Sequence, residues 1–295
     1  MLFHFYADDS KIYISFAPIQ AESELTLSKT EACVMDVRSW MTSNKLKLND
    51  SKTEFLVIGT PQQLKKVSIP HIRIGTEQVV PTKTARDLGT VVDENLKLVP
   101  HVSQIVKSTQ FHLRNVAKIR RYLSQDSAEA LIHSLITSRL DYGNALLFGI
   151  PKKQIKRLQR LQNTAARIVK GIKRRDNREM KPVLYRLHWL PVEQRIDYKI
   201  LLTVFKSLHG LGPQYLRDLL DVYEPLRPLR SSSAPTKLVV PAYLKKPTLG
   251  ERSFSASAPF LWNKLPDEIR RIDSLESFKS NLKSFLFSKT YNHLE

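Results

Sequence analysis

The chain has 295 residues, of which 42% are hydrophobic, so it is long enough to bury a core in two or three modules. Its 47 Lys and Arg residues against 28 Asp and Glu residues give a formal net charge of +19, which favours a polyanion such as nucleic acid as the partner. The single cysteine excludes an internal disulfide framework, and we find neither an apolar run long enough to span a membrane nor a signal-peptide pattern. These features predict an intracellular protein of the nucleus or cytoplasm that is not secreted and has no membrane partner.

The first strong pattern in the chain is a β-hairpin over residues 2–16. Apolar residues alternate with others on both sides of a turn at residues 7–10, as they do in strands with one buried face. Asp8 and Asp9 are adjacent at this turn. Paired carboxylates on a rigid tip are what a polymerase needs to hold divalent metal ions, whereas an ordinary Asp-rich turn is the alternative interpretation.

A helix is predicted over residues 21–44. Cys33, Val37, Trp40 and Met41 keep helical spacing on one apolar face, so we expect this face to be buried, with Cys33 a structural thiol and not a nucleophile. Asn44 is expected to end the helix, because Asn tolerates the left-handed conformation common at helix C-termini.

Short strands are predicted to follow this helix. The first spans residues 53–59, and the others span 69–74, 78–80 and 85–92, with turns at Gly75 and Pro81. Together with the hairpin, and completed by an upstream part, these strands would build an antiparallel sheet backed by helices.

Apolar residues at helical spacing predict three helices between about residues 100 and 170. The second begins at Ser124 to Ser127 and carries Leu131, Leu135 and Ile136, and the third begins with Pro151 at a favourable first-turn position. The first and third also carry cationic stripes: Lys107, Arg114, Lys118 and Arg121 on the first, and Lys153, Arg157, Arg160 and Arg167 on the third. Charged stripes are usually solvated helix faces, but the excess of one sign favours contact with a nucleic-acid backbone.

The remainder of the chain is predicted to be a mainly helical module after a basic linker at residues 170–178. A helix is expected over Val192–Leu208 and a shorter one over Tyr215–Leu220. Residues 224–252 are rich in Pro, Ser and Arg and are expected to form a loop with a short strand near Leu238. A final amphipathic helix carries Leu275, Phe278, Leu282, Phe285 and Leu286.

Several of these segments, in order along the chain, resemble a known family. Tyr6-Ala7-Asp8-Asp9 between two apolar strands resembles the catalytic hairpin of reverse transcriptases. Residues 40–49 and 52–59 resemble the next palm segment in the polymerases of LINE-type (non-LTR) retrotransposons, and residues 85–89 resemble the strand after it. Three later segments resemble the C-terminal regions of the same polymerases: residues 138–147 (SRLDYGNALL), 187–192 (LHWLPV) and 258–266 (APFLWNKLP).

The resemblance implies roles for residues near the hairpin. Asp8 would be the principal ligand of Mg²⁺ (or Mn²⁺) in two-metal nucleotidyl transfer, and Asp9 would support it. Lys52 matches the family position that helps to protonate the pyrophosphate leaving group, and an exposed loop lysine is an equally good description of it. Tyr6, two residues before Asp8 and so on its face, matches a position that packs near the primer end and the incoming nucleotide.

The resemblance also implies an incomplete catalytic site. The first catalytic aspartate of the family precedes the hairpin, whereas this sequence begins with it. Asp87 and Asp93 follow the hairpin in the sequence and are expected to be turn or strand-end residues, not substitutes for that aspartate.

These observations predict an α+β chain in three parts: a partial polymerase palm over residues 1–97, a helical thumb-like region over 98–175 and a mainly helical C-terminal module over 176–295. The expected function is that of a reverse transcriptase fragment, inactive in synthesis, whose partners are an RNA template and an RNA/DNA or DNA duplex. A nucleic-acid-binding remnant without catalysis and a decayed product without function are the alternatives. The sequence leaves the oligomeric state open.

Overall fold

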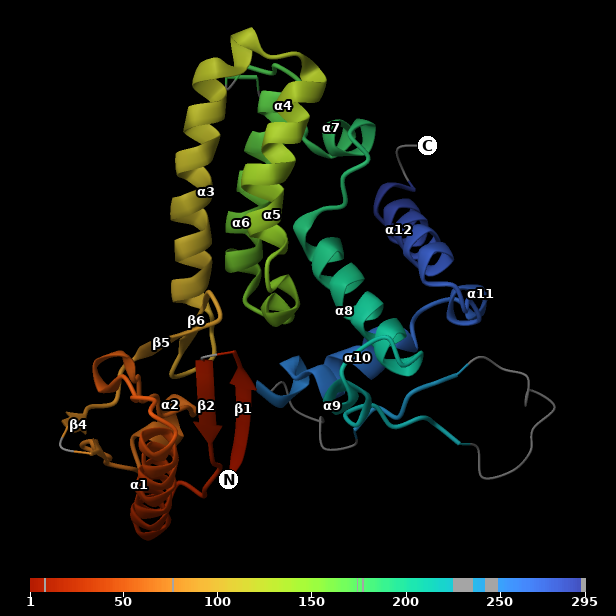
Figure 1. Ribbon diagram of the computed structural model, residues 1–295. Helices are drawn as coiled ribbons and strands as arrows, with labels where there is room; N and C mark the ends of the chain where they lie inside the picture. Colours follow the sequence, from red (N-terminus) through yellow and green to blue (C-terminus); the bar gives the residue numbers. More distant parts are fainter. Residues whose placement is uncertain are drawn as a thin grey trace. The chain divides into compact units, whose positions relative to one another are not determined.

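The computed structural model describes residues 1–7, 9–75, 77–173, 175–176, 178–224, 236–241 and 249–292. The chain forms two compact units, Met1–His101 and Val102–Glu295 (Figure 1). The architecture is α+β, with small antiparallel sheets in the first unit and helices throughout the second. The boundary that we predicted at residue 175 falls inside the second unit.

The N-terminal hairpin consists of β1 (Leu2–Tyr6) and β2 (Asp9–Tyr13), which are antiparallel with Tyr6 opposite Asp9 at the tip end. The predicted hairpin is therefore confirmed, but the predicted burial of one face is wrong. Phe3 and Phe5 remain 67% and 56% exposed, and Tyr6 on the other face is 62% exposed. Two strands alone cannot cover their own apolar side chains, so both faces of this ribbon stay in solvent.

The helix predicted next is α1 (Gln20–Ser43), but its apolar face is not buried as we predicted. Trp40 is 62% exposed and Cys33 is only half-buried, because few apolar partners reach this face within the described residues. The prediction that the helix ends at Asn44 is confirmed, since Asn44 caps the C-terminus of α1, but the left-handed conformation that we expected there is not observed. Asn44 has a φ of −92°, and the next residue, Lys45, takes the left-handed conformation with a φ of +61°.

The strand predicted over residues 53–59 does not form. This segment follows a short 3-10 turn, η1 (Asp50–Lys52), and precedes α2 (Pro61–Leu64). It makes only isolated backbone contacts: Thr82 N–H donates to the Phe55 carbonyl at 2.8 Å, and Gly59 N–H donates to the Glu94 carbonyl at 2.9 Å. A continuous ladder is missing because the neighbouring strands pair with each other.

Two further hairpins complete the first unit. One pairs β3 (Ile72–Ile74) with β4 (Glu77–Val79) across the predicted turn at Gly75, and the other pairs β5 (Thr84–Asp87) with β6 (Thr90–Asp93). The single strand predicted over residues 85–92 is thus split. Leu88 and Gly89 have φ values of +42° and +82°, as a tight two-residue hairpin turn requires.

The three hairpins form separate two-stranded antiparallel sheets, and the joined sheet that we predicted for a completed palm stays a prediction. Among the described residues of the first unit, the buried apolar side chains are those of Ile72, Ile74 and Leu98. This core is small for about 100 residues, which limits the free energy that burial contributes to the unit.

A group of helices begins the second unit. Helix α3 (Val99–Ile119) ends in the 3-10 turn η2 (Arg120–Tyr122), and α4 (Gln125–Ile132) is capped by the Ser124 hydroxyl, which accepts from Ser127 N–H at 3.1 Å. A π-helical turn, η3 (His133–Thr137), connects α4 to α5 (Ser138–Asp141). After the 3-10 turn η4 (Asn144–Leu147) comes α6 (Lys152–Val169), close to the predicted bounds.

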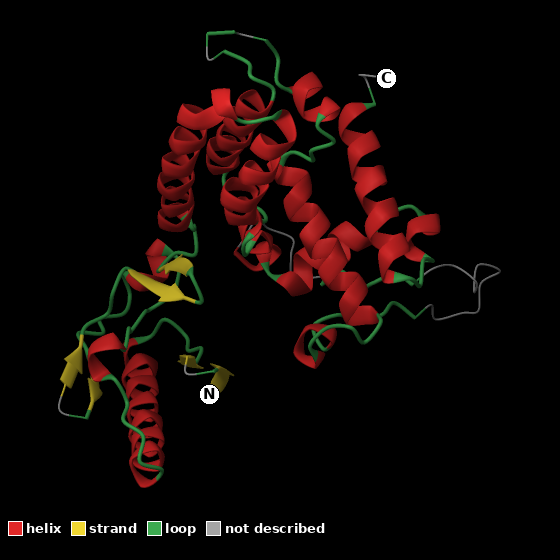
Figure 2. Ribbon diagram, turned by 45° about the horizontal axis from the view of Figure 1, so that its top comes forward, coloured by secondary structure: helices red, strands yellow, loops and turns green. Residues whose placement is uncertain are grey.

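The rest of the second unit packs around α8 (Val192–Leu208), which begins and ends where we predicted. The other elements are α7 (Lys181–Arg186), α9 (Gln214–Arg217), η5 (Leu249–Arg252), α10 (Phe254–Trp262), α11 (Asp267–Arg270) and α12 (Leu275–Tyr291). The Phe205 and Phe278 rings stack at 4.2 Å and join α8 to α12 in the core. In place of the short strand predicted near Leu238, a single bridge pairs Val222 with Leu238. Figure 2 shows how strongly helices dominate this unit.

Candidate nucleic-acid interface

Helix α3 and the turn after it carry an exposed cationic stripe. Lys107, Arg114, Lys118 and Arg121 are all exposed, and spacings of seven, four and three residues keep them on one side. No Asp or Glu occurs between residues 95 and 125, so no carboxylate of this segment neutralises the stripe. Within the described residues, none of these cations forms an ion pair, which leaves their charges available to an anionic partner.

Two exposed aromatic residues accompany this stripe, and our sequence analysis did not identify them. Phe111, which is 55% exposed, follows Lys107 by four residues and precedes Arg114 by three. Tyr122 is 72% exposed, and the Arg121 guanidinium lies 4.6 Å from its ring centroid. The sequence does contain a signal for these two residues, namely aromatic residues that alternate with cations at helical spacing. Such a surface can contact a nucleic-acid backbone through its cations and stack on bases through its rings.

The stripe on α6 lies beside the stripe on α3. Ser103 is four residues before Lys107 and therefore on its side of α3, and Arg157 is four residues after Lys153 on α6. The Arg157 guanidinium donates to the Ser103 hydroxyl at 3.2 Å, which joins the two stripes. At the other end, Arg120 donates to the Ile168 and Val169 carbonyls at 2.7 and 2.9 Å. The two helices are thus held side by side, as Figure 1 also shows.

Only part of the α6 stripe is free to bind a ligand. Lys153 and Arg160 are exposed, whereas Arg157 is half-buried and also donates to the Gln154 side chain at 2.8 Å. Arg157 is therefore engaged within the fold, and its contact with nucleic acid stays a prediction. The guanidinium lies between two helices because Ser103 and Gln154 offer it acceptors there.

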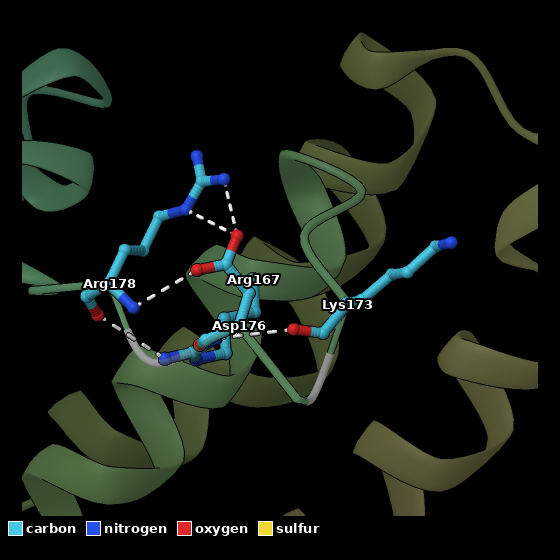
Figure 3. A network of polar contacts seen from close by, with 4 residues as sticks. All are labelled: Arg167, Lys173, Asp176 and Arg178. Carbon is cyan, nitrogen blue, oxygen red and sulfur yellow. Dashed lines mark hydrogen bonds and ion pairs between the residues drawn. The ribbon is translucent and has the colours of Figure 1, made fainter.

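Arg167 is likewise engaged within the fold (Figure 3). Its Nη1 donates to the Asp176 carbonyl at 2.6 Å and to the Lys173 carbonyl at 3.4 Å, so it fastens the segment after α6. Arg178 completes this network by donating from Nε to the Asp176 carboxylate at 2.7 Å, which lowers the pKa of that carboxyl group. Backbone carbonyls of the linker therefore bind the Arg167 guanidinium, and its contact with nucleic acid stays a prediction.

The structure therefore assigns to one side of α3 and α6 a set of exposed residues that we call the basic surface: Lys107, Phe111, Arg114, Lys118, Arg121, Tyr122, Lys153 and Arg160. Cations spaced along two neighbouring helices can follow the phosphates of a strand, and none of them reads a sequence by that means.

The hairpin residues that the resemblance singled out are only partly described. Asp8 lies outside the described residues. Asp9 is exposed at the start of β2 and opposite Tyr6, so these two side chains share one face of the hairpin. Lys52 is exposed at the end of η1, and within the described part of the chain no hydrogen bond or ion pair connects it to Tyr6 or Asp9.

The other two carboxylates that we considered have contacts within the fold, as predicted for turn or strand-end residues. Asp87 ends β5 and forms an ion pair with Lys11. Asp93 is buried at the end of β6, where its carboxylate accepts from Lys97 N–H at 3.0 Å and from Leu98 N–H at 2.5 Å. In the described ranges, no three His, Cys, Asp or Glu side chains come close enough together to hold a metal ion.

No helix in the described part of the chain is both long and apolar enough to cross a bilayer. Comparisons of the chain with protein-family models, with curated proteins and with solved structures found no match.

Proposed function

We propose that the chain is a nucleic-acid-binding part of a LINE-type reverse transcriptase, and that its second unit binds the backbone of a duplex through the basic surface. The single observation that carries this proposal is the exposed positive charge of the basic surface on α3 and α6, whose cations form no ion pair among the described residues. Both helices lack Asp and Glu entirely, although the chain as a whole contains 28 such residues. A helix face that contacts only solvent can carry charges of both signs. A face that binds a polyanion is expected to carry positive charges without carboxylates among them.

The family assignment in this proposal depends on the ordered motifs from the hairpin to residue 266. RNA/DNA hybrid and DNA duplex are then the expected partners, with an RNA template in the intact polymerase. Nucleotidyl transfer with Mg²⁺ or Mn²⁺ is the activity that Asp8, Asp9 and Lys52 would serve in such a polymerase. We assign backbone binding, and not nucleotidyl transfer, to this chain. The described residues include the whole basic surface, but only Asp9 of the proposed catalytic pair Asp8 and Asp9.

Affinity measured as a function of salt tests the binding proposal. The full chain is titrated with a labelled RNA/DNA hybrid and with a DNA duplex of unrelated sequence between about 50 and 200 mM salt. We expect similar affinities for both duplexes and a steep loss of affinity as salt rises, because phosphate contacts release counterions. Absence of binding at the lowest salt, or an affinity that salt does not change, would refute the proposal.

Primer extension on an annealed RNA template, with dNTPs and Mg²⁺ or Mn²⁺, separates binding from synthesis. We expect no extension by the chain alone. Extension that is lost in Asp8→Ala and Asp9→Ala would instead assign polymerase activity to the hairpin.

A further inference from the structure

A cavity of about 410 Å³ lies within the second unit, and none of its lining residues belongs to the basic surface. Two of the motifs from the sequence analysis meet there: residues 138–147 contribute Asp141 and Asn144, and residues 187–192 contribute His188 and Trp189. Helix α8 adds Arg195 and Lys199. The proposed backbone contacts use none of these residues, and the volume is that of a small-molecule site.

An unused hydrogen-bond acceptor lines this cavity. Asn144 is only 3% exposed, and its Nδ2 points to the Asp141 carboxylate at 3.5 Å. A carboxylate only accepts, so the amide must present its N–H₂ group to Asp141 and leave its Oδ1 for another donor. Among the described residues Oδ1 has no partner. Oδ1 is itself buried, so a ligand reaches it when the Asn144 side chain turns toward the cavity, and a donor there gains affinity because a buried acceptor without a partner is costly.

A hydrogen-bond donor stands next to this acceptor. Arg195 donates from Nε to Asp141 Oδ1 at 2.8 Å, and its Nη2 forms an ion pair with Asp141 Oδ2. Within the described residues Nη1 makes no hydrogen bond, so its hydrogens are available. Asp141 therefore holds two lining residues of the cavity next to each other: Asn144, with its unused acceptor, and Arg195, with its unused donor. Nucleobases carry donors and acceptors side by side on their Watson–Crick edge.

Aromatic side chains also line the cavity. Trp189 is 95% buried, with its Nε1 donating to Glu129 at 3.1 Å and its ring 5.4 Å from the ring of His133. His188 is exposed beside it. Flat rings of this kind stack on nucleobases. Glu129 also lies within 3.5 Å of His133 Nε2, and Asp141 is paired with Arg195, so both carboxylates of the cavity already have partners.

The cavity also has cations for a phosphate group. Lys199 from α8 and Lys283 from α12 line it, both are exposed, and neither forms an ion pair among the described residues. A lysine ammonium on a flexible stem is a common phosphate ligand.

We propose that this cavity binds one nucleotide unit, with the base hydrogen-bonded to Asn144 and Arg195 beside Trp189 and the phosphate bound by Lys199 and Lys283. This proposal rests on the proposed function, because the nucleotide unit would come from a nucleic-acid strand bound at the basic surface. The same chemistry would hold either an unpaired base of a bound single strand or a free nucleotide, and the experiment distinguishes these sources.

The test compares three probes at one salt concentration by fluorescence anisotropy: a single-stranded oligonucleotide, the same strand with abasic residues, and its duplex. Lys199→Gln combined with Lys283→Gln is expected to weaken single-strand binding about tenfold more than duplex binding. Replacing the bases by abasic residues should weaken binding to the parent chain by a similar factor, because both changes remove contacts in the cavity. The same replacement should have little effect on the lysine variant, in which the nucleotide is no longer held in the cavity.

The matched control is Lys206→Gln combined with Lys289→Gln, which removes the same charges from α8 and α12 outside the cavity. Equal losses in the two double variants, or equal affinity for abasic and base-containing strands, would overturn the proposal. Asn144→Leu should repeat the single-strand loss, with its melting temperature measured to verify folding. The exposed lysine variants keep the proposal testable if that variant does not fold.

A mononucleotide that competes with the single strand identifies a free nucleotide as the ligand, and a base-dependent strand affinity without such competition identifies an unpaired base. Competition by inorganic phosphate as strong as that by the mononucleotide would overturn the base assignment. If the parent chain binds none of the probes in a salt-dependent way, the proposed function fails. If the parent chain binds in a salt-dependent way but the cavity variants lose no more affinity than the control variant, the cavity proposal fails and the proposed function stands.

Discussion

Removal of the α3 cations tests which charges on the protein contact nucleic acid. In the variant Lys107→Gln, Arg114→Gln, Lys118→Gln, Arg121→Gln, four exposed charges are lost. No described carboxylate pairs with them, and the contacts that the variant loses among the described residues are the Arg121–Tyr122 ring contact and the hydrogen bond from Arg114 to the Gln110 carbonyl, both at exposed residues. Each phosphate contact contributes about −0.9 to the slope of log affinity against log salt, so four contacts contribute about −3.6. Over a fourfold rise in salt, this slope corresponds to a loss of about 150-fold in affinity.

The assay is a series of binding isotherms with one labelled duplex between about 50 and 200 mM salt, for the parent chain and the variant. We expect the slope of the variant to be shallower by about 3 to 4 units. Circular dichroism and a melting curve verify that the helices are intact, since Gln is a good helix former.

The structure supplies an internal control for this prediction. Arg157 and Arg167 carry the same charge on α6, but Ser103, Gln154 and linker carbonyls occupy their guanidinium groups. Arg157→Gln with Arg167→Gln should therefore leave the salt slope nearly unchanged and lower the free energy of unfolding, by about 1.5–3 kcal/mol for each charged hydrogen-bonding group. An unchanged slope in the α3 variant, or an equal change in the Arg157/Arg167 variant, would refute the reasoning that exposure decides which cations bind.

Three further predictions follow from contacts elsewhere in the chain. Burial, with repulsion from Glu193 as a smaller cause, raises the pKa of Asp197 from 3.8 to about 6, so the native state binds more protons than the unfolded state and stability falls as pH rises from about 4 to 6. Asp197→Asn should remove this fall and raise the free energy of unfolding at neutral pH by up to about 3 kcal/mol in urea titrations, and equal gains at acidic and neutral pH would contradict this cause. Asp93→Ala should cost about 1–3 kcal/mol and accelerate hydrogen exchange at the Lys97 and Leu98 amides, whereas unchanged protection there would show that the carboxylate does not hold this loop. Limited proteolysis should cut residues 1–101 before 102–169, because the first unit has few buried apolar side chains, and equal protection of both would show that the hairpins are held by more than the observed core.

The sequence alone determined the elements whose signal is local. The period of the apolar residues placed α8 at Val192–Leu208, and the same reasoning came close for α1 and α6. The alternation around Ala7 predicted the β1–β2 hairpin, because turn residues and period-two patterns are properties of adjacent residues.

Tertiary contacts decided which strands pair and whether an amphipathic face is covered. Residues 53–59 have the composition of a strand, but a strand needs a partner, and β5 pairs with β6 instead. Trp40 has helical spacing with its apolar neighbours, yet it stays 62% exposed because little in the described part of the first unit packs on it. Period and propensity carry no information on how much apolar surface the rest of the chain supplies.

The candidate sites show the same division most clearly. Residue spacing predicted Lys107 and Arg114 on one side of a helix, and it predicted Arg167 on a similar stripe. Only the fold shows that the Arg167 guanidinium donates to the Asp176 and Lys173 carbonyls. The cavity joins Asn144 to Arg195 and Lys283, which are far apart in the sequence. Charge and spacing are local properties that a sequence states directly, whereas the hydrogen-bond partners of a side chain depend on which distant segments the folded core brings next to it.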